Sequence, residues 1–174
     1  CIRDRIKYVV KQGATLKLAS SIYVRNIFLI EPGGALDIPH PYFTWGVGTT
    51  KLSADGTLAT GHEEGITTVP NKGCVQTDLQ ELSEQGIYTF NGNSPQSIGN
   101  INFSSKVGNL IFNNPKGLRL SSNLTTLNFL SIQSGFHDLS GYKLTLGVNQ
   151  SSNLECVSGG IYCSKNTGTF IRYI

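Results

Sequence analysis

The sequence predicts an all-β protein with little or no helix, folded as a single-stranded, right-handed parallel β-helix, or solenoid. The first observation is a series of short apolar runs between Gly86 and Gly147, each bounded by Gly, Asn or Ser. The runs are LIF at 110–112, LRL at 118–120, FLSI at 129–132 and LTL at 144–146. Each run is too short for a helix, and regularly spaced short strands between turn residues are a β signal. A strand and turn about every 10 residues, two to a repeat of about 20, are typical of solenoid coils.

The second observation is an internal repeat near the N-terminus. The run YVVKQGATLKL, from Tyr8, aligns with FLIEPGGALDI, from Phe28, at an offset of 20 residues. In both copies an apolar run leads into a Gly-containing turn and then a strand. Lys17 between two leucines shows the period of two that brings alternate side chains to one face. The offset suits one solenoid coil, so residues 6–38 are predicted to form the first β block.

We expect one domain over residues 1–174, with an irregular, loop-rich insertion at 39–65. A chain of 174 residues is long enough to bury one core. The insertion is predicted because PHPYFTWGVGTT at 39–50 brings two prolines and the single Trp into the repeat pattern. The run QTDLQELSEQG at 76–86 is either one helical turn or a pair of polar strands.

The two ends of the chain predict a piece of a longer protein. The chain starts at Cys1 without Met, and it ends on the apolar run 169–174 with no polar cap. Because an open solenoid end exposes core and unpaired strand edges, we expect further repeats of the same polypeptide, or a partner, to cover it. A processed lipoprotein, lipidated at Cys1, is the alternative interpretation of the start.

Composition indicates a secreted or cell-surface protein. Charged residues make up only 14% of the chain, against about 25% in an average soluble domain. The net charge of +3 is small and scattered, whereas a nucleic-acid face needs a dense basic patch with aromatics, so no nucleic-acid partner is expected. No run reaches the ~18 consecutive apolar residues of a membrane span.

Aromatic residues in the predicted insertion are the first candidates for ligand binding. Tyr42, Phe43 and Trp45 lie close together and would stack on the face of a sugar ring. The alternative is an aromatic plug that covers an edge of the core. His62 is the fourth candidate, because it follows them on the same insertion.

His62 also opens the run HEEGI, which raises the question of a metal. A helical zinc site of the HExxH type needs a second histidine at position 66, where this chain has Ile. A loop metal site stays an alternative, but we expect no metal site and no cofactor.

Cys156 and Cys163 are predicted to form a disulfide. They are seven positions apart, with a Gly-Gly turn between them, and an oxidising compartment would favour the bond. Free, buried thiols are the alternative. The absence of any CxxC pair excludes a zinc ribbon.

No catalytic constellation is recognised, so we predict that the protein is not an enzyme. Glycoside hydrolysis needs two carboxylates facing each other across a groove, and the five aspartates form no evident pair. The dipeptide His137-Asp138 comes nearest to a functional dyad, and a surface turn ahead of Leu139 is the preferred explanation.

Six segments between residues 54 and 147 carry a resemblance to a known group of proteins. They are GTLATGHEEGITT, GCVQT, GIYTFNGNSPQSIG, VGNLIFNN, GLRLSSNLTTLNFLSIQSG and DLSGYKLTLG. In this order they resemble repeat modules of large secreted cell-surface proteins of Bacteroidetes, and residues 8–38 do so more loosely. The resemblance implies export by type IX secretion and an adhesin-like or structural role without catalytic residues. Many such proteins end in a C-terminal sorting domain, which is not recognised here and again indicates a fragment.

The residues shared with those modules are implied to be structural. Glycines would form turns, at Gly92, Gly99 and Gly147. Leucines and Phe112 in the short runs would form the stacked core. Asn113 and Asn114 would bond between coils at a corner of the solenoid.

These observations together predict a non-enzymatic structural or adhesive module of a secreted bacterial cell-surface protein. Its partners would be glycans, other surface proteins or further repeats of the same chain. The alternative is a carbohydrate-active β-helix, either a polysaccharide lyase or hydrolase or a glycan-binding protein.

Overall fold

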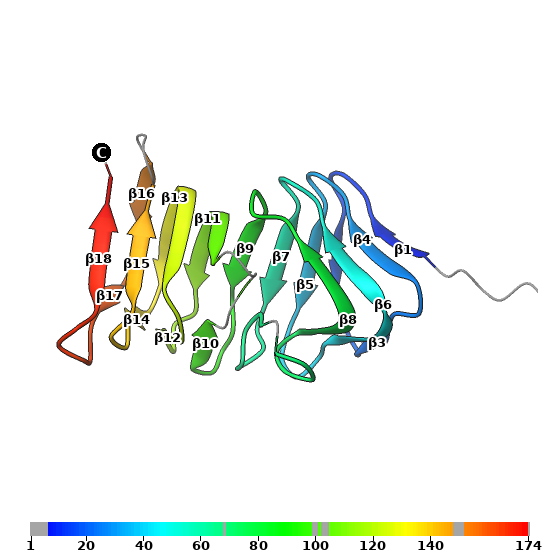
Figure 1. Cartoon of the computed structure of the whole chain (residues 1–174), viewed down its shortest axis with the longest axis horizontal. Coiled ribbons are helices and arrows are strands. Elements are labelled where there is room, and N and C mark those ends of the chain that lie inside the picture. The colour runs from blue at the N-terminus through cyan, green and yellow to red at the C-terminus, as the bar shows by residue number, and fades with distance from the viewer. Residues whose placement is uncertain (1–6, 68, 99–100, 102–104, 148–151, 174) are drawn as a thin grey trace, which may run out of the picture.

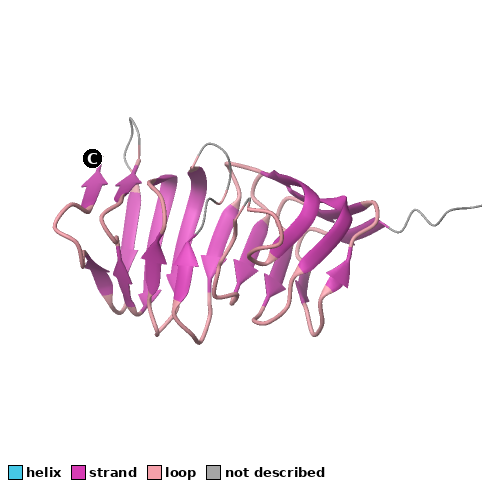
Figure 2. Ribbon diagram, turned by 60° about the horizontal axis from the view of Figure 1, so that its bottom comes forward, coloured by secondary structure: helices cyan, strands magenta, loops and turns pink. Residues whose placement is uncertain are grey.

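The chain folds as a parallel β-solenoid of about 7 turns, as the computed structural model shows (Figure 1). The structure describes residues 7–67, 69–98, 101, 105–147 and 152–173, so Cys1 and Gly99 lie outside the described residues. Within these ranges every regular element is a strand and none is a helix (Figure 2). The predicted fold class is therefore confirmed.

None of the described segments forms a helix long and apolar enough to cross a membrane.

The strands form three sheets, and every strand pairing in them is parallel. Sheet A contains β1 (Lys7–Val10), β3 (Ile22–Tyr23), β4 (Ile27–Ile30), β6 (Thr44–Leu52) and β8 (Val75–Leu82). Sheet B contains β2 (Thr15–Lys17), β5 (Ala35–Ile38), β7 (Thr57–Thr60), β9 (Ile87–Phe90), β11 (Lys106–Asn113), β13 (Leu124–Ser134), β15 (Lys143–Leu146), β16 (Asn153–Cys156) and β18 (Thr169–Arg172). Sheet C contains β10 (Gln96–Ile98), β12 (Leu118–Leu120), β14 (Phe136–Asp138) and β17 (Gly160–Tyr162). Sheet A belongs to the N-terminal half and sheet C to the C-terminal half, while sheet B runs along both (Figure 1).

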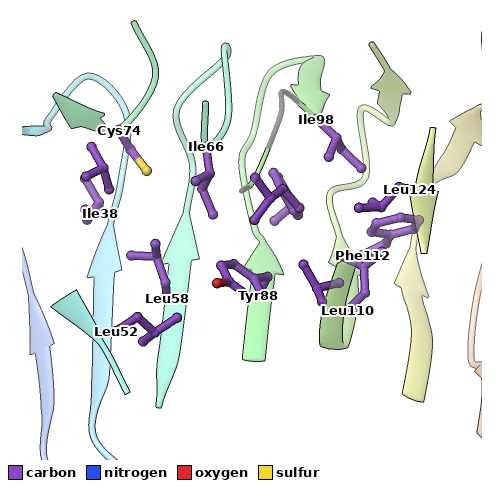
Figure 3. Close-up of a cluster of buried hydrophobic side chains, with 14 of the residues drawn as sticks. Ile38, Leu52, Leu58, Ile66, Cys74, Tyr88, Ile98, Leu110, Phe112 and Leu124 are labelled. Carbon is purple, nitrogen blue, oxygen red and sulfur yellow. The ribbon is translucent and has the colours of Figure 1, made fainter. Parts of the chain in front are cut away.

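One column of side chains runs along sheet B and is fully buried from Leu36 to Leu130. Strand register aligns, in order, Leu16, Leu36, Leu58, Tyr88, Leu110, Leu130 and Leu154. Successive members are 20, 22, 30, 22, 20 and 24 positions apart along the chain. Figure 3 shows three of them, Leu58, Tyr88 and Leu110, following one another. Both β-branched and γ-branched side chains pack well in such columns because parallel strands repeat the same face at each coil.

The internal repeat predicted from the sequence is the observed register. Tyr8 is the strand partner of Phe28, and Leu16 is the partner of Leu36. The rings of Tyr8 and Phe28 stack with centroids 5.4 Å apart. An offset of 20 residues is therefore one complete coil.

The range 39–65 is more regular than predicted. It contains all of the nine-residue strand β6 and all of β7, which belong to sheets A and B. Pro39 and Pro41 precede β6 and leave its ladder intact, because proline is excluded only where a strand needs the N–H. The real interruption is shorter and later, between the end of β7 and the start of β8. The run 76–86 is most of the single strand β8 followed by a turn, so it is neither a helical turn nor a pair of strands.

The corner that joins sheets A and B in the N-terminal half has a different form in the C-terminal half. In the N-terminal half it is a four-residue turn closed by a backbone hydrogen bond, as in Gly34 N to Glu31 O (2.9 Å) and Gly56 N to Ser53 O (3.1 Å). In the C-terminal half β11 runs through the corner without a turn and changes register between Val107 and Asn109. A Cβ on the intervening Gly108 would lie 3.0 Å from the backbone of Gln85, so the close approach requires glycine.

Candidate functional site

The outer surface of sheet C carries a groove with a volume of about 330 Å³. Strand register sets its long axis, because β10, β12, β14 and β17 lie side by side. One column across these strands contains Ser97, Arg119, Asp138 and Tyr162. A neighbouring column contains Phe136 and its strand partner Gly160. The rest of the lining comes from Glu63, Pro95, Gln96, Lys116, Gly117 and Leu118.

Two exposed aromatic side chains line the groove. Phe136 is 68% exposed and Tyr162 is 50% exposed, although aromatic residues are normally buried. They lie on the adjacent strands β14 and β17, in a diagonal arrangement that long side chains can span. A Cβ on Gly160 would lie 3.7 Å from the ring of Phe136. Glycine at this position therefore leaves that side of the phenyl ring uncovered.

Asp138 lies under these aromatics, is only 4% exposed, and is saturated with hydrogen bonds. Its Oδ1 accepts from Ser140 N (2.8 Å) and from Ser164 N (3.0 Å). Its Oδ2 accepts from the hydroxyls of the same two serines. Burial by itself would raise the pKa of Asp138, but the hydrogen bonds from Ser164 and Ser140 outweigh it and hold the pKa well below the usual range. Asp138 is therefore a fixed negative charge.

Arg119 is the strand partner of Asp138 and points out of the sheet. Its side chain is 72% exposed, and its Nε lies 3.8 Å from Asp138 Oδ2, which is an ion pair but too long for a hydrogen bond. In the part of the chain that the structure describes, the side chain of Arg119 forms no hydrogen bond. Its donors are free for a ligand.

His137 faces the opposite way, into the core. It is 2% exposed and packs on Phe112, with ring centroids 4.8 Å apart. Neither ring nitrogen has a hydrogen-bond partner among the described residues. Burial lowers the pKa of His137 to about 4, and the backbone of Ser134 opposes this shift without meeting hydrogen-bond geometry. Because neighbouring residues of a strand point to opposite faces, His137 and Asp138 form no dyad, and they belong to a strand rather than to a surface turn.

A buried amide network supports one edge of the groove. Gln96 is 2% exposed, and its Oε1 accepts from Gly92 N (2.9 Å) and Asn114 Nδ2 (2.7 Å). Its Nε2 donates to the carbonyls of Thr60 and His62, both at 3.0 Å. The side chain therefore uses both oxygen lone pairs and both N–H groups, and it links three successive coils.

The asparagines at the same corner behave as the sequence predicted. Asn114 is fully buried and donates to Ser94 O (2.8 Å) of the preceding coil as well as to Gln96. Asn113 accepts from the hydroxyl of Ser134 (3.0 Å) in the following coil. Both bond between coils, so the predicted packing role is confirmed.

The four ligand-binding candidates from the sequence are divided between two places. Trp45 is 46% exposed on sheet A and meets the ring of Tyr23 edge-to-face, with centroids 4.7 Å apart. Tyr42 and Phe43 are half-buried beside it in the chain, and Tyr42 packs against the core. Binding of a ligand by these three residues stays a prediction.

His62 lies on the loop after β7, where its ring meets that of His40 with centroids 5.6 Å apart. Burial, and then the charge of His40, lowers the pKa of His62, while Glu64 and Glu63 oppose the shift. No group of three or more His, Cys, Asp or Glu side chains with metal-binding geometry occurs among the described residues. The next residue, Glu63, lines the sheet C groove, so this loop contributes to the groove through the neighbour of the predicted residue.

A second hollow, of about 370 Å³, lies on the outer side of β8. Its lining is Pro70, Asn71 and residues 76–80. Register places Gln76 beside Trp45, so the hollow adjoins the Tyr23–Trp45 pair. It contains one acidic group, Asp78, and no basic one.

The predicted disulfide is absent, because Cys156 and Cys163 are both free and exposed. Cys156 ends a strand of sheet B, whereas Cys163 follows a strand of sheet C. Each thiol instead contacts a nearby carbonyl, Gly159 O and Lys165 O respectively. The Gly-Gly segment between them is the corner that separates the two sheets, so closeness in sequence does not bring the sulfur atoms together.

Sequence reasoning missed the residues that line the groove. Arg119, Phe136 and Tyr162 are spread over three coils, and none stands out in its own segment. The signal that could have located them is the outward residue of each short run. These residues are Arg119 in LRL at 118–120, Phe136 in FHD at 136–138 and Tyr162 in IYC at 161–163. Aligning these runs by coil places their outward residues side by side.

Comparisons with protein families, with curated proteins and with solved structures gave no match.

Proposed function

We propose that this chain is a non-enzymatic structural and adhesive module of a secreted or cell-surface protein, and that the sheet C groove is its contact site for glycans. The observation that carries the proposal is the pair of exposed rings, Phe136 and Tyr162, beside the charged and polar side chains of one groove. A sugar ring offers C–H groups to an aromatic face and hydroxyls to polar neighbours. Sites of this composition gain most of their energy from the aromatic contacts and their orientation from a few polar groups.

The fold supports an adhesive role in a second way. A solenoid repeats the same outward positions at each coil, so a groove along its axis accommodates an extended chain molecule. The low charge content and the resemblance of the repeats to bacterial surface modules agree with a location outside the cell.

The chemistry of the groove disfavours the alternative, a polysaccharide hydrolase or lyase. Two carboxyl groups line it, Glu63 and Asp138. A hydrolase needs one carboxyl group with a raised pKa to protonate the leaving oxygen. Asp138 has a lowered pKa and four hydrogen-bond donors already on its oxygens. It is suited to hold other groups in place rather than to transfer a proton.

Glycan binding by the purified chain tests the proposal. We expect binding to members of a glycan array, and we expect Phe136→Ala and Tyr162→Ala each to weaken that binding by about tenfold, equivalent to about 1.4 kcal/mol. Trp45→Ala, an exposed aromatic of another face, is the matched control and should leave the affinity unchanged. Urea unfolding of each variant checks that the fold is intact.

Two outcomes would count against the proposal. Absence of binding to every glycan would remove the adhesive role, and loss of binding in Trp45→Ala alone would move the site to sheet A. Release of reducing ends or of unsaturated sugars from acidic or neutral polysaccharides would instead support the enzymatic alternative.

A further inference from the structure

We infer that the sheet C groove selects acidic saccharides, those that carry carboxylate or sulfate groups, and that Arg119 is the residue that recognises the anion. The inference rests on the proposed glycan-binding function and adds the ligand class and the specificity-determining residue. Three features of the groove support it: the exposed donors of Arg119, the hydrogen-bonded carboxylate of Asp138 and the exposed charges of the lining.

Arg119 is available to an external anion. It stands on the central part of the groove, between Ser97 of β10 and Asp138 of β14. Its guanidinium is exposed, and among the described residues its one ion pair is the 3.8 Å approach of Nε to Asp138 Oδ2. A guanidinium presents its donors as a planar fork that matches a carboxylate or a sulfate, which makes arginine the usual residue for such groups.

Asp138 orients this arginine without competing for its donors. Both carboxylate oxygens already accept two hydrogen bonds from Ser140 and Ser164. Four bonds fill the acceptor sites of a carboxylate. Asp138 therefore attracts Arg119 through its charge, while the hydrogen-bonding capacity of the guanidinium remains for the ligand.

The accessible charge of the groove favours an anion. Lys116 and Arg119 are exposed cationic residues of the lining, and Lys116 forms no ion pair in the described part of the chain. Glu63 is the exposed acidic residue among the described residues of the lining, whereas the carboxylate of Asp138 is buried and both its oxygens are occupied by serine donors. Complementary charge mainly sets specificity, so the ligand that fits both the rings and the cations is an acidic sugar.

The hollow beside Trp45 is the natural contrast. It has an exposed acid, Asp78, and no cation in its lining. An anionic ligand has no partner there, so the inference applies to the sheet C groove alone.

The test compares acidic oligosaccharides with their own methyl esters, which keep the sugar rings and remove only the charge. The probes are oligogalacturonate, alginate oligomers and a glucuronate–hexosamine oligomer, each as acid and as ester, measured by calorimetry. We expect the acid form of at least one to bind about tenfold more tightly than its ester. Arg119→Gln should remove that difference and leave the affinity for the ester unchanged, and Arg119→Lys should restore only part of it.

Arg25→Gln, which removes an exposed arginine of the N-terminal half, is the matched control and should keep the full preference. The preference should also shrink as sodium chloride is raised, because exposed charges are screened. Equal affinity for acids and esters, or a preference that survives in Arg119→Gln, would overturn the inference and leave the proposed glycan binding standing. No binding to acids, esters or neutral glycans would defeat the proposed function itself.

Discussion

The two halves of the solenoid share one apolar column but bury different polar groups. In the N-terminal half the buried polar side chains are threonines, as in the contacts of Thr50 Oγ1 with Thr77 (3.0 Å) and Thr44 (3.4 Å). Its ion pairs are at the surface, as in Lys51–Glu81 at 2.7 Å. In the C-terminal half the buried groups include an amide network, a histidine and a carboxylate.

This difference coincides with the position of the groove. Gln96, His137 and Asp138 all belong to strands of sheet C, whose outer face forms the groove. A hydroxyl cluster can rearrange at little cost, whereas a saturated amide or carboxylate fixes the strands that carry its donors. The C-terminal half thus uses buried polar groups to hold the groove surface in place. The N-terminal half has a core of apolar side chains and threonine hydroxyls.

The largest effect should be the same in both halves. Phe28 and Phe112 are at most 1% exposed, one in each half of the core. Truncating either to alanine removes a ring and leaves a cavity, so Phe28→Ala and Phe112→Ala should each lower the free energy of unfolding by about 3–5 kcal/mol. Urea denaturation measures the loss, with the exposed Phe136→Ala as control. A much smaller loss for one of the two would mean that the halves do not share one core.

Acid should weaken the C-terminal half first. Burial lowers the pKa of His137 to about 4 in the fold from its ordinary value of 6.5, so the unfolded chain binds more protons between these values and stability falls as pH falls through them. The full loss would be about 3 kcal/mol. The pKa of Asp138 is lowered as well, so a further loss should begin as pH falls below its ordinary value of 3.8.

His137→Leu makes this pH prediction specific. Leucine would pack on Phe112 in place of the imidazole and would bury no unpaired nitrogens, so the variant should be more stable than the native chain by about 1–3 kcal/mol at neutral pH. Thermal unfolding at several pH values should show a shallower slope between about pH 6.5 and 4. The part that remains would come from His62, whose pKa is also lowered. An unchanged slope would show that His137 is not the group that titrates.

Removing a buried polar side chain should destabilise the C-terminal half more than the N-terminal half. Gln96→Ala leaves two donors and two carbonyls without their partner, so a loss of about 2–4 kcal/mol is expected. Thr77→Val, its counterpart in the N-terminal half, removes one hydroxyl of similar shape and should cost only about 1 kcal/mol. Equilibrium unfolding in urea measures both. Equal losses would contradict the difference drawn between the two halves.

The smallest effect should come from the surface ion pairs of the N-terminal half. Lys51 and Glu81 are both about half exposed, so Lys51→Ala should change the free energy of unfolding by less than about 1 kcal/mol. Differential scanning calorimetry at low and high salt would detect it as a difference that fades with added salt. A salt-independent loss above that size would indicate that the lysine stem, rather than the charge, stabilises sheet A.

The sequence predicted the coil better than the groove, for a physical reason. The repeat of Tyr8 at Phe28 is visible because core side chains must be apolar at every coil. Outward positions carry no such restriction, so the column of Ser97, Arg119, Asp138 and Tyr162 has no common chemistry. The alignment of these four residues also depends on the lengths of the turns between strands, which vary from coil to coil. Ligand binding was predicted for Trp45 because tryptophan is rare. The role of Arg119 can be recognised only from the residues that lie beside it in the fold.

The predicted disulfide shows the same limit. Cys156 and Cys163 are close along the chain, but a corner of the solenoid lies between them and places them in different sheets. Separation in sequence bounds the distance between two residues, and strand register decides which atoms meet. The packing role of Asn114 was expected from the resemblance of its segment to known repeat modules, and its bonds to Ser94 and Gln96 agree with it.

The column of sheet B keeps its register across the longest coil. Leu58 is the strand partner of Tyr88, although 30 positions separate them and the loop after β7 takes up the excess. Part of this loop packs in the core, since Ile66 and Cys74 are fully buried, whereas residues 69–72 are exposed. Loop closure becomes only slowly more costly with length, so natural variants or designed libraries can lengthen or rewrite residues 69–72 without disturbing the coils on either side. This loop also carries Glu63 to the rim of the groove. Substitutions in its exposed part could change ligand specificity with the least loss of stability.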